Sequence, residues 1–273
     1  MTIAHIAQND QRALDAVEKA KARQEDLLPY LDFYAALLRE QFNFKAALTD
    51  QPGVHDETIR QQRLADGVAQ LTFEQLGVEA EPLATLVVRL WDVMVSHNPE
   101  WAGGREALDP DELLALIRQE FEVQAPFKAP PPTDPTTTEV LIRLALSPYL
   151  QRAAEVILPL LDLSRWGRGY CPVCGGQPHF SALRGEGERS LLCSRCNAEW
   201  SFSRMGCPFC DNADHSQLTY YPSQDGVYRL YVCQACRRYL KTIDLRQAEG
   251  HVLAVEPILT VGMDLSAREE GYR

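Results

Sequence analysis

Apolar residues recur at intervals of three and four along the first 165 residues, which is the spacing of one face of an α-helix. The clearest stripe consists of Leu31, Tyr34, Leu38 and Phe42. The segment from Leu83 to Val95 is apolar on nearly every side, so we expect it at the centre of a core. Spacing and capping residues predict further helices over residues 10–25, 57–72, 110–121 and 138–163. Residues 1–165 are therefore predicted to form an all-helical domain.

Proline interrupts this helical pattern at two places. Residues 129–135 contain four prolines, which predicts an extended linker. The predicted helix that follows holds Pro148 and Pro159, and we expect it to bend around them because proline lacks the N–H that helix geometry uses. This half of the chain contains no motif with catalytic spacing. We therefore interpret it as a helical scaffold, one face of which is available to a partner, and not as an enzyme.

The pattern changes at Trp166, where short strand-like segments replace the helical spacing. Strands are predicted over residues 179–183, 190–192, 218–221 and 227–232. Gly185-Glu186-Gly187 and Asp225-Gly226 supply the turns of two hairpins. The predicted modules span residues 166–204 and 205–245, followed by a tail over residues 246–273. We expect the tail to be helical and to pack back on the protein.

All eight cysteines lie in this second half, in four Cys-x-x-Cys pairs. One structural tetrahedral metal site takes four sulfurs, and a Cys-x-x-Cys turn supplies two of them. Disulfides would need an oxidising compartment, and the N-terminal sequence lacks the basic and apolar regions of an export signal. A redox Cys-x-x-Cys usually occurs once in an α/β domain. Metal binding therefore explains the four pairs best.

An internal repeat decides which pairs share an ion. The first and third pairs are Cys-Pro-x-Cys, whereas the second and fourth lack the proline and follow a strand. Arg189 and Arg229 lie four residues before Cys193 and Cys233. The repeat favours sequential pairing over the nested and cross-braced arrangements. The predicted ligands are Cys171, Cys174, Cys193 and Cys196 for site 1, and Cys207, Cys210, Cys233 and Cys236 for site 2. Two closed sites are structural, and zinc is the default metal, with iron possible because it accepts the same four thiolates.

Charge and hydropathy exclude two classes of partner. The chain carries a formal net charge of −11, and residues 170–245 hold 8 basic against 7 acidic residues. Sequence-independent nucleic-acid binding needs clustered Lys and Arg, so we expect no nucleic acid. No run reaches the roughly 18 apolar residues of a membrane-spanning helix, so we expect none. These features predict a cytoplasmic protein.

The cysteine motifs resemble those of the formate dehydrogenase accessory protein family, FdhE. The resemblance rests on Cys171-Pro172-Val173-Cys174-Gly175, Leu192-Cys193 with Cys196 and Glu199-Trp200, Arg204 with Cys207 and Cys210, Cys233 with Cys236 and Tyr239-Leu240-Lys241, and the tail Glu270-Gly271-Tyr272. It implies an N-terminal helical domain followed by two tandem rubredoxin-like or zinc-ribbon modules. It also implies a non-enzymatic assembly factor that binds the catalytic subunit of formate dehydrogenase in the cytoplasm before twin-arginine export.

The residues around the second and fourth pairs have two interpretations. Glu199, Trp200 and Arg204 lie in the segment that joins the two modules, and Tyr239 and Lys241 follow the last cysteine pair. They are candidate contacts between modules or with a partner. In the alternative, Trp200 covers the first metal site and Glu199 pairs with Arg204. The rival functions are a rubredoxin-like iron protein that transfers electrons and a nucleic-acid-binding zinc ribbon.

Overall fold

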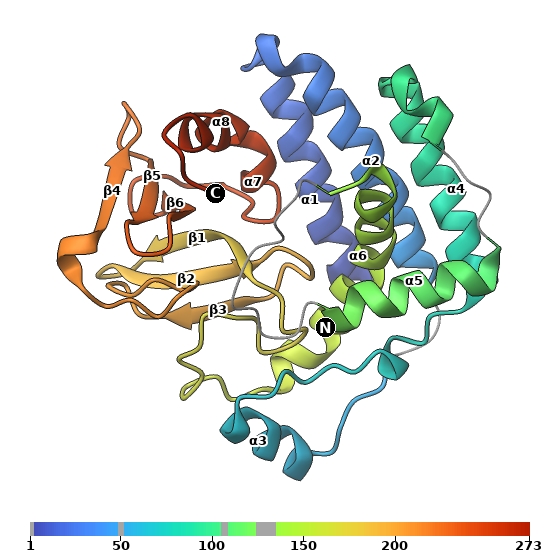
Figure 1. The fold of residues 1–273 in the computed structure, drawn as a ribbon, viewed down its shortest axis with the longest axis horizontal. Helices are drawn as coiled ribbons and strands as arrows, with labels where there is room; N and C mark the ends of the chain where they lie inside the picture. The colour runs from blue at the N-terminus through green and yellow to red at the C-terminus, as the bar shows by residue number, and fades with distance from the viewer. Residues whose placement is uncertain (1–2, 49–51, 105–108, 124–134) are drawn as a thin grey trace. The chain divides into compact units, whose positions relative to one another are not determined.

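The computed structural model describes residues 3–48, 52–104, 109–123 and 135–273 (Figure 1). The chain divides into two compact units, Met1–His55 with Leu71–Leu160 and Asp56–Gln70 with Leu161–Arg273. Most of the proline-rich linker predicted at residues 129–135 lies outside the described residues. None of the helices in the described part of the chain is both long enough and apolar enough to cross a membrane.

The first unit is built from five α-helices in its described residues. They are α1 (Ile3–Lys21), α2 (Leu28–Ala47), α4 (Ala80–His97), α5 (Pro110–Val123) and α6 (Thr137–Ile157). Short 3-10 turns connect or extend them: Glu25–Leu27, Glu74–Leu76, Pro99–Gly104 and Leu158–Leu160. Helix α2 packs against α1, α4 and α6, and α4 packs against α5 and α6. The helical unit predicted from the apolar spacing is confirmed.

Helix α6 holds the centre of this unit. It begins with a capping box, in which Thr136 accepts the N–H of Glu139 while the Glu139 carboxylate accepts the N–H of Thr136. Twelve of its residues are buried, including Pro148, and the helix continues through that proline. It ends at Ile157, before Pro159, whereas the sequence predicted an end near residue 163.

The helix predicted over residues 83–95 forms as α4 and packs against α2, α5 and α6, but only one of its faces is buried. In α4 the buried residues form one stripe, and Val88 on the other side is 38% exposed. The stripe consists of Leu83, Leu86, Leu90, Trp91 and Met94. Valines outside the buried stripe, such as Val88, made the segment look apolar all round, but an isolated exposed apolar side chain is common on protein surfaces.

A buried ion cluster ties three helices of the first unit together. The Lys45 side chain is 3% exposed, and its Nζ lies 2.6 Å from Asp10 Oδ1 and 2.7 Å from Glu155 Oε1. The three residues belong to α2, α1 and α6. A buried ammonium needs such partners because its desolvation costs several kcal/mol. Burial of Asp10 raises the pKa of its carboxyl, and the adjacent Lys45 opposes that effect.

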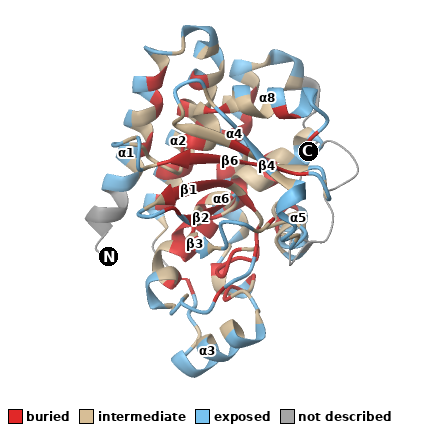
Figure 2. Ribbon diagram, turned by 90° about the vertical axis from the view of Figure 1, so that its left-hand side faces the viewer, coloured by how far each residue is buried: buried red, intermediate tan, exposed pale blue. Residues whose placement is uncertain are grey.

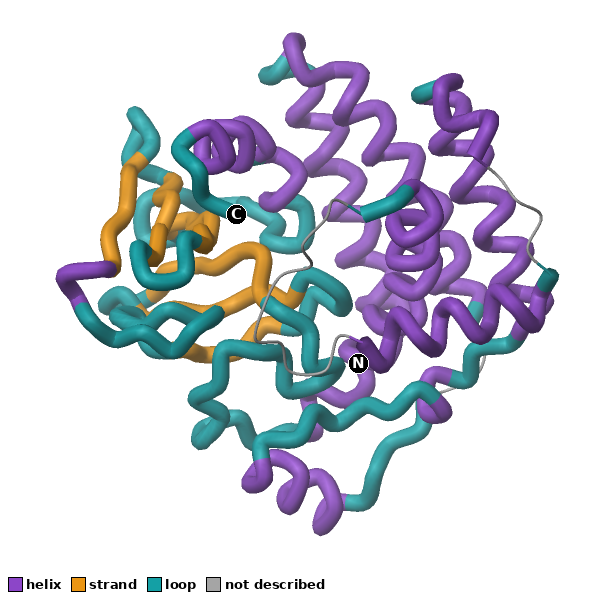
Figure 3. Tube along the Cα trace, in the orientation of Figure 1, coloured by secondary structure: helices purple, strands orange, loops and turns teal. Residues whose placement is uncertain are grey.

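The second unit is built on one six-stranded sheet. Its strands are β1 (Pro178–Arg184), β2 (Glu188–Cys193), β3 (Glu199–Phe202), β4 (Leu218–Pro222), β5 (Tyr228–Cys233) and β6 (Arg238–Asp244). The strand order is β3-β2-β1-β6-β5-β4. Each predicted module contributes three antiparallel strands, and β1 pairs with β6 in parallel to join them. Figure 2 shows that β1, β2 and β6 are largely buried, and Figure 3 shows long loops between the strands.

The C-terminal tail covers one face of this sheet. It forms α7 (Glu256–Leu259) and α8 (Val261–Glu269). Ala267 and Tyr272 pack against Leu230 and Val232 of β5. Because side chains alternate between the two faces of a strand, the tail covers the face of β5 that carries Leu230 and Val232. The opposite face of β5 is available to the rest of the module.

Helix α3 (Glu57–Asp66) also belongs to the second unit, although the sequence placed it in the helical half. Asp56 caps its first turn, and Gly67 ends it at a φ of 71°, several residues before the predicted end at residue 72. Two hydrogen bonds tie the following loop to the first cysteine pair. The Gln70 N–H donates to the Pro172 carbonyl at 2.9 Å, and the Tyr170 hydroxyl donates to the Gly67 carbonyl at 2.7 Å.

Candidate metal centres

The first four cysteines meet at one point between two chain turns. Cys171 and Cys174 come from the loop before β1, and Cys193 and Cys196 come from the turn between β2 and β3. The Sγ–Sγ distances are 3.6 Å for Cys171–Cys196, 3.5 Å for Cys174–Cys193 and 3.5 Å for Cys174–Cys196. Four sulfurs about 2.3 Å from one ion would lie about 3.8 Å apart, so the set has the size of a tetrahedral metal site.

The second four cysteines repeat this arrangement. Sγ of Cys207 lies 3.7 Å from Sγ of Cys236, and Sγ of Cys210 lies 3.8 Å from Sγ of Cys233. All four sulfurs lie within 4.8 Å of one another, as do those of the first set. We call the two sets cluster 1 (Cys171, Cys174, Cys193, Cys196) and cluster 2 (Cys207, Cys210, Cys233, Cys236). The grouping is the sequential one that the internal repeat favoured.

The backbone of each cysteine pair turns back through a left-handed residue. The residues that follow the four pairs all have positive φ: Gly175 at 74° and Asn197, Asp211 and Arg237 at 56° each. Inside two of the turns, backbone N–H groups point toward sulfur: those of Val173 and Arg195 donate to Sγ of Cys171 and Cys193 at 3.4 Å. N–H donors of this kind stabilise thiolates and orient metal ligands. Of these four left-handed residues, only the glycine could be expected from the sequence.

The two clusters differ in their access to solvent. All four cysteines of cluster 1 are buried, whereas in cluster 2 Cys210 is exposed and Cys236 is half-buried. Burial raises the pKa of the Cys171 and Cys196 thiols in cluster 1 and of the Cys207 and Cys236 thiols in cluster 2. Cys233 behaves differently: burial opposes ionisation, but N–H groups such as that of Cys236 lower its pKa to about 7. Hydrogen bonds from neighbouring thiols likewise lower the pKa of Cys174 in cluster 1, so the two clusters differ in solvent access and not in ionisation.

Three of the five candidate contact residues are used inside the second unit. Trp200 is 2% exposed, and its indole N–H donates to the Arg168 carbonyl at 2.9 Å. The Tyr239 hydroxyl donates to Asp264 Oδ1 at 2.7 Å, and Lys241 Nζ donates to Asp264 Oδ2 at 2.5 Å. The Trp200 hydrogen bond stabilises the surroundings of the first cysteine set. The hydrogen bonds of Tyr239 and Lys241 attach the C-terminal tail to β6.

The other two residues, Glu199 and Arg204, do not pair with each other. Glu199 forms its ion pair with Arg184 of β1, and Arg204 is exposed. The salt bridge between Glu199 and Arg204 considered from the sequence is therefore not formed.

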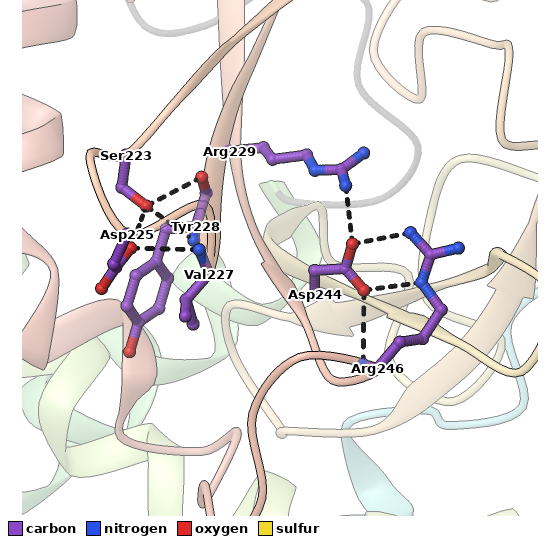
Figure 4. Close-up of polar contacts among 7 residues, drawn as sticks. All are labelled: Ser223, Asp225, Val227, Tyr228, Arg229, Asp244 and Arg246. Carbon is purple, nitrogen blue, oxygen red and sulfur yellow. Dashed lines mark hydrogen bonds and ion pairs between the residues drawn. The ribbon is translucent and has the colours of Figure 1, made fainter.

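Sequence reasoning missed a buried acid at the end of β6. Asp244 is fully buried, and it accepts hydrogen bonds from Arg229 at 2.6 Å and from Arg246 at 2.6 and 2.7 Å (Figure 4). Hydrogen bonds from Arg246, reinforced by the positive charges of both arginines, hold the pKa of its carboxyl below the usual range. The carboxylate therefore stays ionised, and its hydrogen bonds attach the loop that follows β6 to strand β5.

The arginine at the equivalent place in the first module, Arg189, has no acidic partner in the part of the chain that the structure describes. Arg189 is 4% exposed, its Nη1 donates to the Gly206 carbonyl at 3.2 Å, and its guanidinium carbon lies 5.0 Å from the centre of the Tyr231 ring. Burial lowers its pKa to about 10, which leaves it charged at neutral pH. The signal in the sequence was the repeated arginine four residues before the second and fourth cysteine pairs.

Fold and clusters together define a class of protein: an all-helical unit followed by two zinc-ribbon-like modules that share one sheet. Within that class, residues 170–204 match the family model described as FdhE, central domain. The chain is 26% identical over 271 residues to the FdhE homolog of Aquifex aeolicus, covering 95% of this chain and 91% of that protein. It is 28% identical over 267 residues to FdhE of Escherichia coli O127:H6, covering 92% and 81%.

A solved structure shows the same fold. The crystal structure of the FdhE protein from Pseudomonas aeruginosa matches with a TM-score of 0.67 and 21% identity, over 100% of this chain and 94% of that one. The resemblance to the FdhE family that the cysteine motifs indicated is thus confirmed by the family model and by the relatives in sequence, and the solved structure shows a shared fold.

Proposed function

We propose that this chain is an accessory protein required for the assembly of active formate dehydrogenase. Similarity to FdhE proteins along nearly the whole chain carries the proposal. In this proposal the chain binds the catalytic subunit of formate dehydrogenase in the cytoplasm, before that subunit is exported. Two four-cysteine clusters, each without an open ligand position, support a binding role over catalysis at the metal.

We further propose that each cluster holds one metal ion. Its ligands would be the four thiolates of cluster 1 and the four of cluster 2, whose sulfur spacing fits a tetrahedral ion. The bound ion would supply folding free energy, because each small module has too little core to hold its hairpin alone. Zinc is the default ion for four thiolates in a structural site.

A binding experiment tests the accessory role. The tagged, metal-loaded chain is mixed under anaerobic conditions with the catalytic subunit of the source organism's formate dehydrogenase, and the complex is isolated. We expect a complex, and we expect a strain that lacks the chain to lose formate dehydrogenase activity until the gene is restored. A wild-type chain that does not bind, in a strain whose enzyme remains active without it, would refute the proposal.

One observation favours a second candidate, a rubredoxin-like iron protein that transfers electrons. Cys210 of cluster 2 is exposed, and an exposed thiolate ligand gives an electron a short route to a partner. Elemental analysis of anaerobically purified protein separates the candidates. Two zinc ions in a colourless protein would eliminate the redox candidate, whereas iron with thiolate absorption that bleaches reversibly on reduction would establish it.

A further inference from the structure

The second unit contains a pocket beside cluster 2. The pocket has a volume of about 220 Å³ and lies between the segment that joins the two modules and strands β4, β5 and β6. Its apolar and aromatic walls include Met205, Phe209, Leu218, Tyr220, Tyr231 and Leu240. A cavity of about 150 Å³ holds a benzene molecule, so this one accepts a large side chain with a small polar group attached.

The charged residues of the pocket all have the same sign. Arg189, Arg204 and Arg238 line it, and no Asp or Glu is among its lining residues. Arg238 has other partners: it donates to Gln177 at 2.6 Å and lies over the Phe209 ring at 3.7 Å. Arg189 is buried, and its Nε–H has no acceptor among the described residues. A buried guanidinium without an acid is costly, which makes an external anion a favourable partner.

The internal repeat shows which group is absent. Arg229 occupies in the second module the place that Arg189 occupies in the first, four residues before the third cysteine of its cluster. The second module then places Asp244 eleven residues after that cysteine, and Asp244 pairs with Arg229 (Figure 4). In the first module the same position is Arg204. One copy thus contains an internal ion pair where the other copy contains two arginines.

The negative charge of the cluster 2 thiolates does not balance the positive charge of the three pocket arginines. Four thiolates around a divalent ion carry a net charge of −2, against three arginines in the pocket. One positive charge remains, which suits a singly charged carboxylate better than a doubly charged phosphate. Arginine also presents its N–H groups in a fork that matches the two oxygens of a carboxylate.

An extended partner segment suits the outer wall of the pocket. Strand β4 is the edge of the sheet, and its residues Tyr220 and Tyr221 are 46% and 53% exposed. A free strand edge offers main-chain hydrogen bonds to a peptide, and exposed Tyr and Arg side chains are typical of the residues that dominate binding energy.

We propose that this pocket binds a carboxylate carried beside a large apolar side chain on an extended segment of a partner protein. Arg189 and Arg204 would take the carboxylate, and Tyr220, Tyr231 and Met205 would take the apolar side chain. The proposal rests on the proposed function in so far as the partner is the catalytic subunit, and it names the surface and the chemistry of that contact.

Two matched pairs of variants test the surface in the binding experiment described above. Arg204→Gln removes an exposed pocket arginine, and Arg165→Gln removes an exposed arginine of the same unit that does not line the pocket. Tyr220→Ala and Tyr221→Ala change adjacent residues of β4 on opposite faces of the sheet, and only Tyr220 lines the pocket. We expect Arg204→Gln to weaken binding about 3- to 5-fold, as for an exposed ion pair. We expect Tyr220→Ala to weaken it about tenfold, with both controls near wild type.

A small-molecule arm tests the pocket independently of any subunit. The full metal-loaded chain is titrated by NMR with N-acetylphenylalanine, which carries a carboxylate beside a phenyl ring, and with the uncharged N-acetylphenylalaninamide. The proposal expects the acid to bind, the amide to bind at least tenfold more weakly, and Arg204→Gln to reduce the difference. Equal binding of acid and amide, no binding of either, or displacement of the acid by millimolar inorganic phosphate would overturn it. A wild-type chain that binds the acid but not the catalytic subunit would count against the proposed function alone.

Discussion

Replacing Asp244 by Asn tests the buried ion cluster at the end of β6. The fully buried carboxylate receives three hydrogen bonds of 2.6 to 2.7 Å from two arginines. Removing one member of a buried ion pair costs about 3–5 kcal/mol because the other member is left without compensation. The side chain of Arg246 is 31% exposed and that of Arg229 is 12% exposed, so water recovers part of this loss. We therefore expect Asp244→Asn to lower the free energy of unfolding by about 3 kcal/mol, near the lower end of that range.

Urea unfolding in metal-replete buffer measures this change, because urea does not screen charges and a fixed metal concentration keeps ligand linkage constant. With a slope of about 2 kcal/mol per molar urea, the midpoint should fall by about 1.5 M. Glu199→Gln is the control, since Glu199 and its partner Arg184 are 33% and 42% exposed and such a pair contributes about 1 kcal/mol or less. A midpoint for Asp244→Asn that is no lower than that of the control would refute the reasoning.

Three further predictions concern pH, metal release and backbone strain. The pKa of Asp244 is lower in the folded protein than in the unfolded chain, so the ionised carboxylate stabilises the fold above the unfolded pKa of about 4. This stabilisation is lost as pH falls through the folded pKa. The difference in unfolding free energy between wild type and Asp244→Asn, measured by urea unfolding, should therefore shrink below pH 4. A colorimetric chelator should release metal in two phases, the faster from cluster 2, where Cys210 is exposed, and Cys210→Ser should change only that phase; release in a single phase would contradict the assignment. Gly175→Ala forces a side chain into a φ of 74° and should cost about 1–2 kcal/mol in the same urea assay, whereas an unchanged midpoint would show that the turn relaxes.

The cysteine clusters could be predicted from the sequence because their geometry is local. A Cys-x-x-Cys turn places two sulfurs on one side of a short loop, and a hairpin brings the next pair to it. The repeat of Cys-Pro-x-Cys then indicated the grouping without any knowledge of the sheet. Strands β3 and β6 were not predicted from the sequence: Arg238 to Asp244 mixes polar and apolar residues without strict alternation, and its last five residues are all buried.

The joining of the modules could not be predicted, because it depends on contacts between distant residues. Strands β1 and β6 pair in parallel with Phe180 opposite Lys241, and the Ser181 and Thr242 hydroxyls lie 2.5 Å apart. Neither strand carries a pattern that names the other as its partner. The same holds for α3: its spacing predicts a helix, but the hydrogen bonds from Gln70 to Pro172 and from Tyr170 to Gly67, which attach its loop beside the first cysteine pair, leave no signal in the sequence.

Duplicated modules with equivalent ligands have acquired different surroundings, and the difference points to different roles. Cluster 1 is enclosed, with Trp200 packed inside the module, so an ion bound there would exchange only through local opening. Cluster 2 keeps Cys210 at the surface and lies beside the pocket lined by Arg189 and Arg204. Two modules whose only purpose was to hold structural ions would gain stability from burying all their thiolates and pairing all their buried arginines. The exposed Cys210 and the buried Arg189 without an acidic partner both lower stability, and both lie beside the same pocket. Proteins retain destabilising features of this kind chiefly at surfaces that bind a partner.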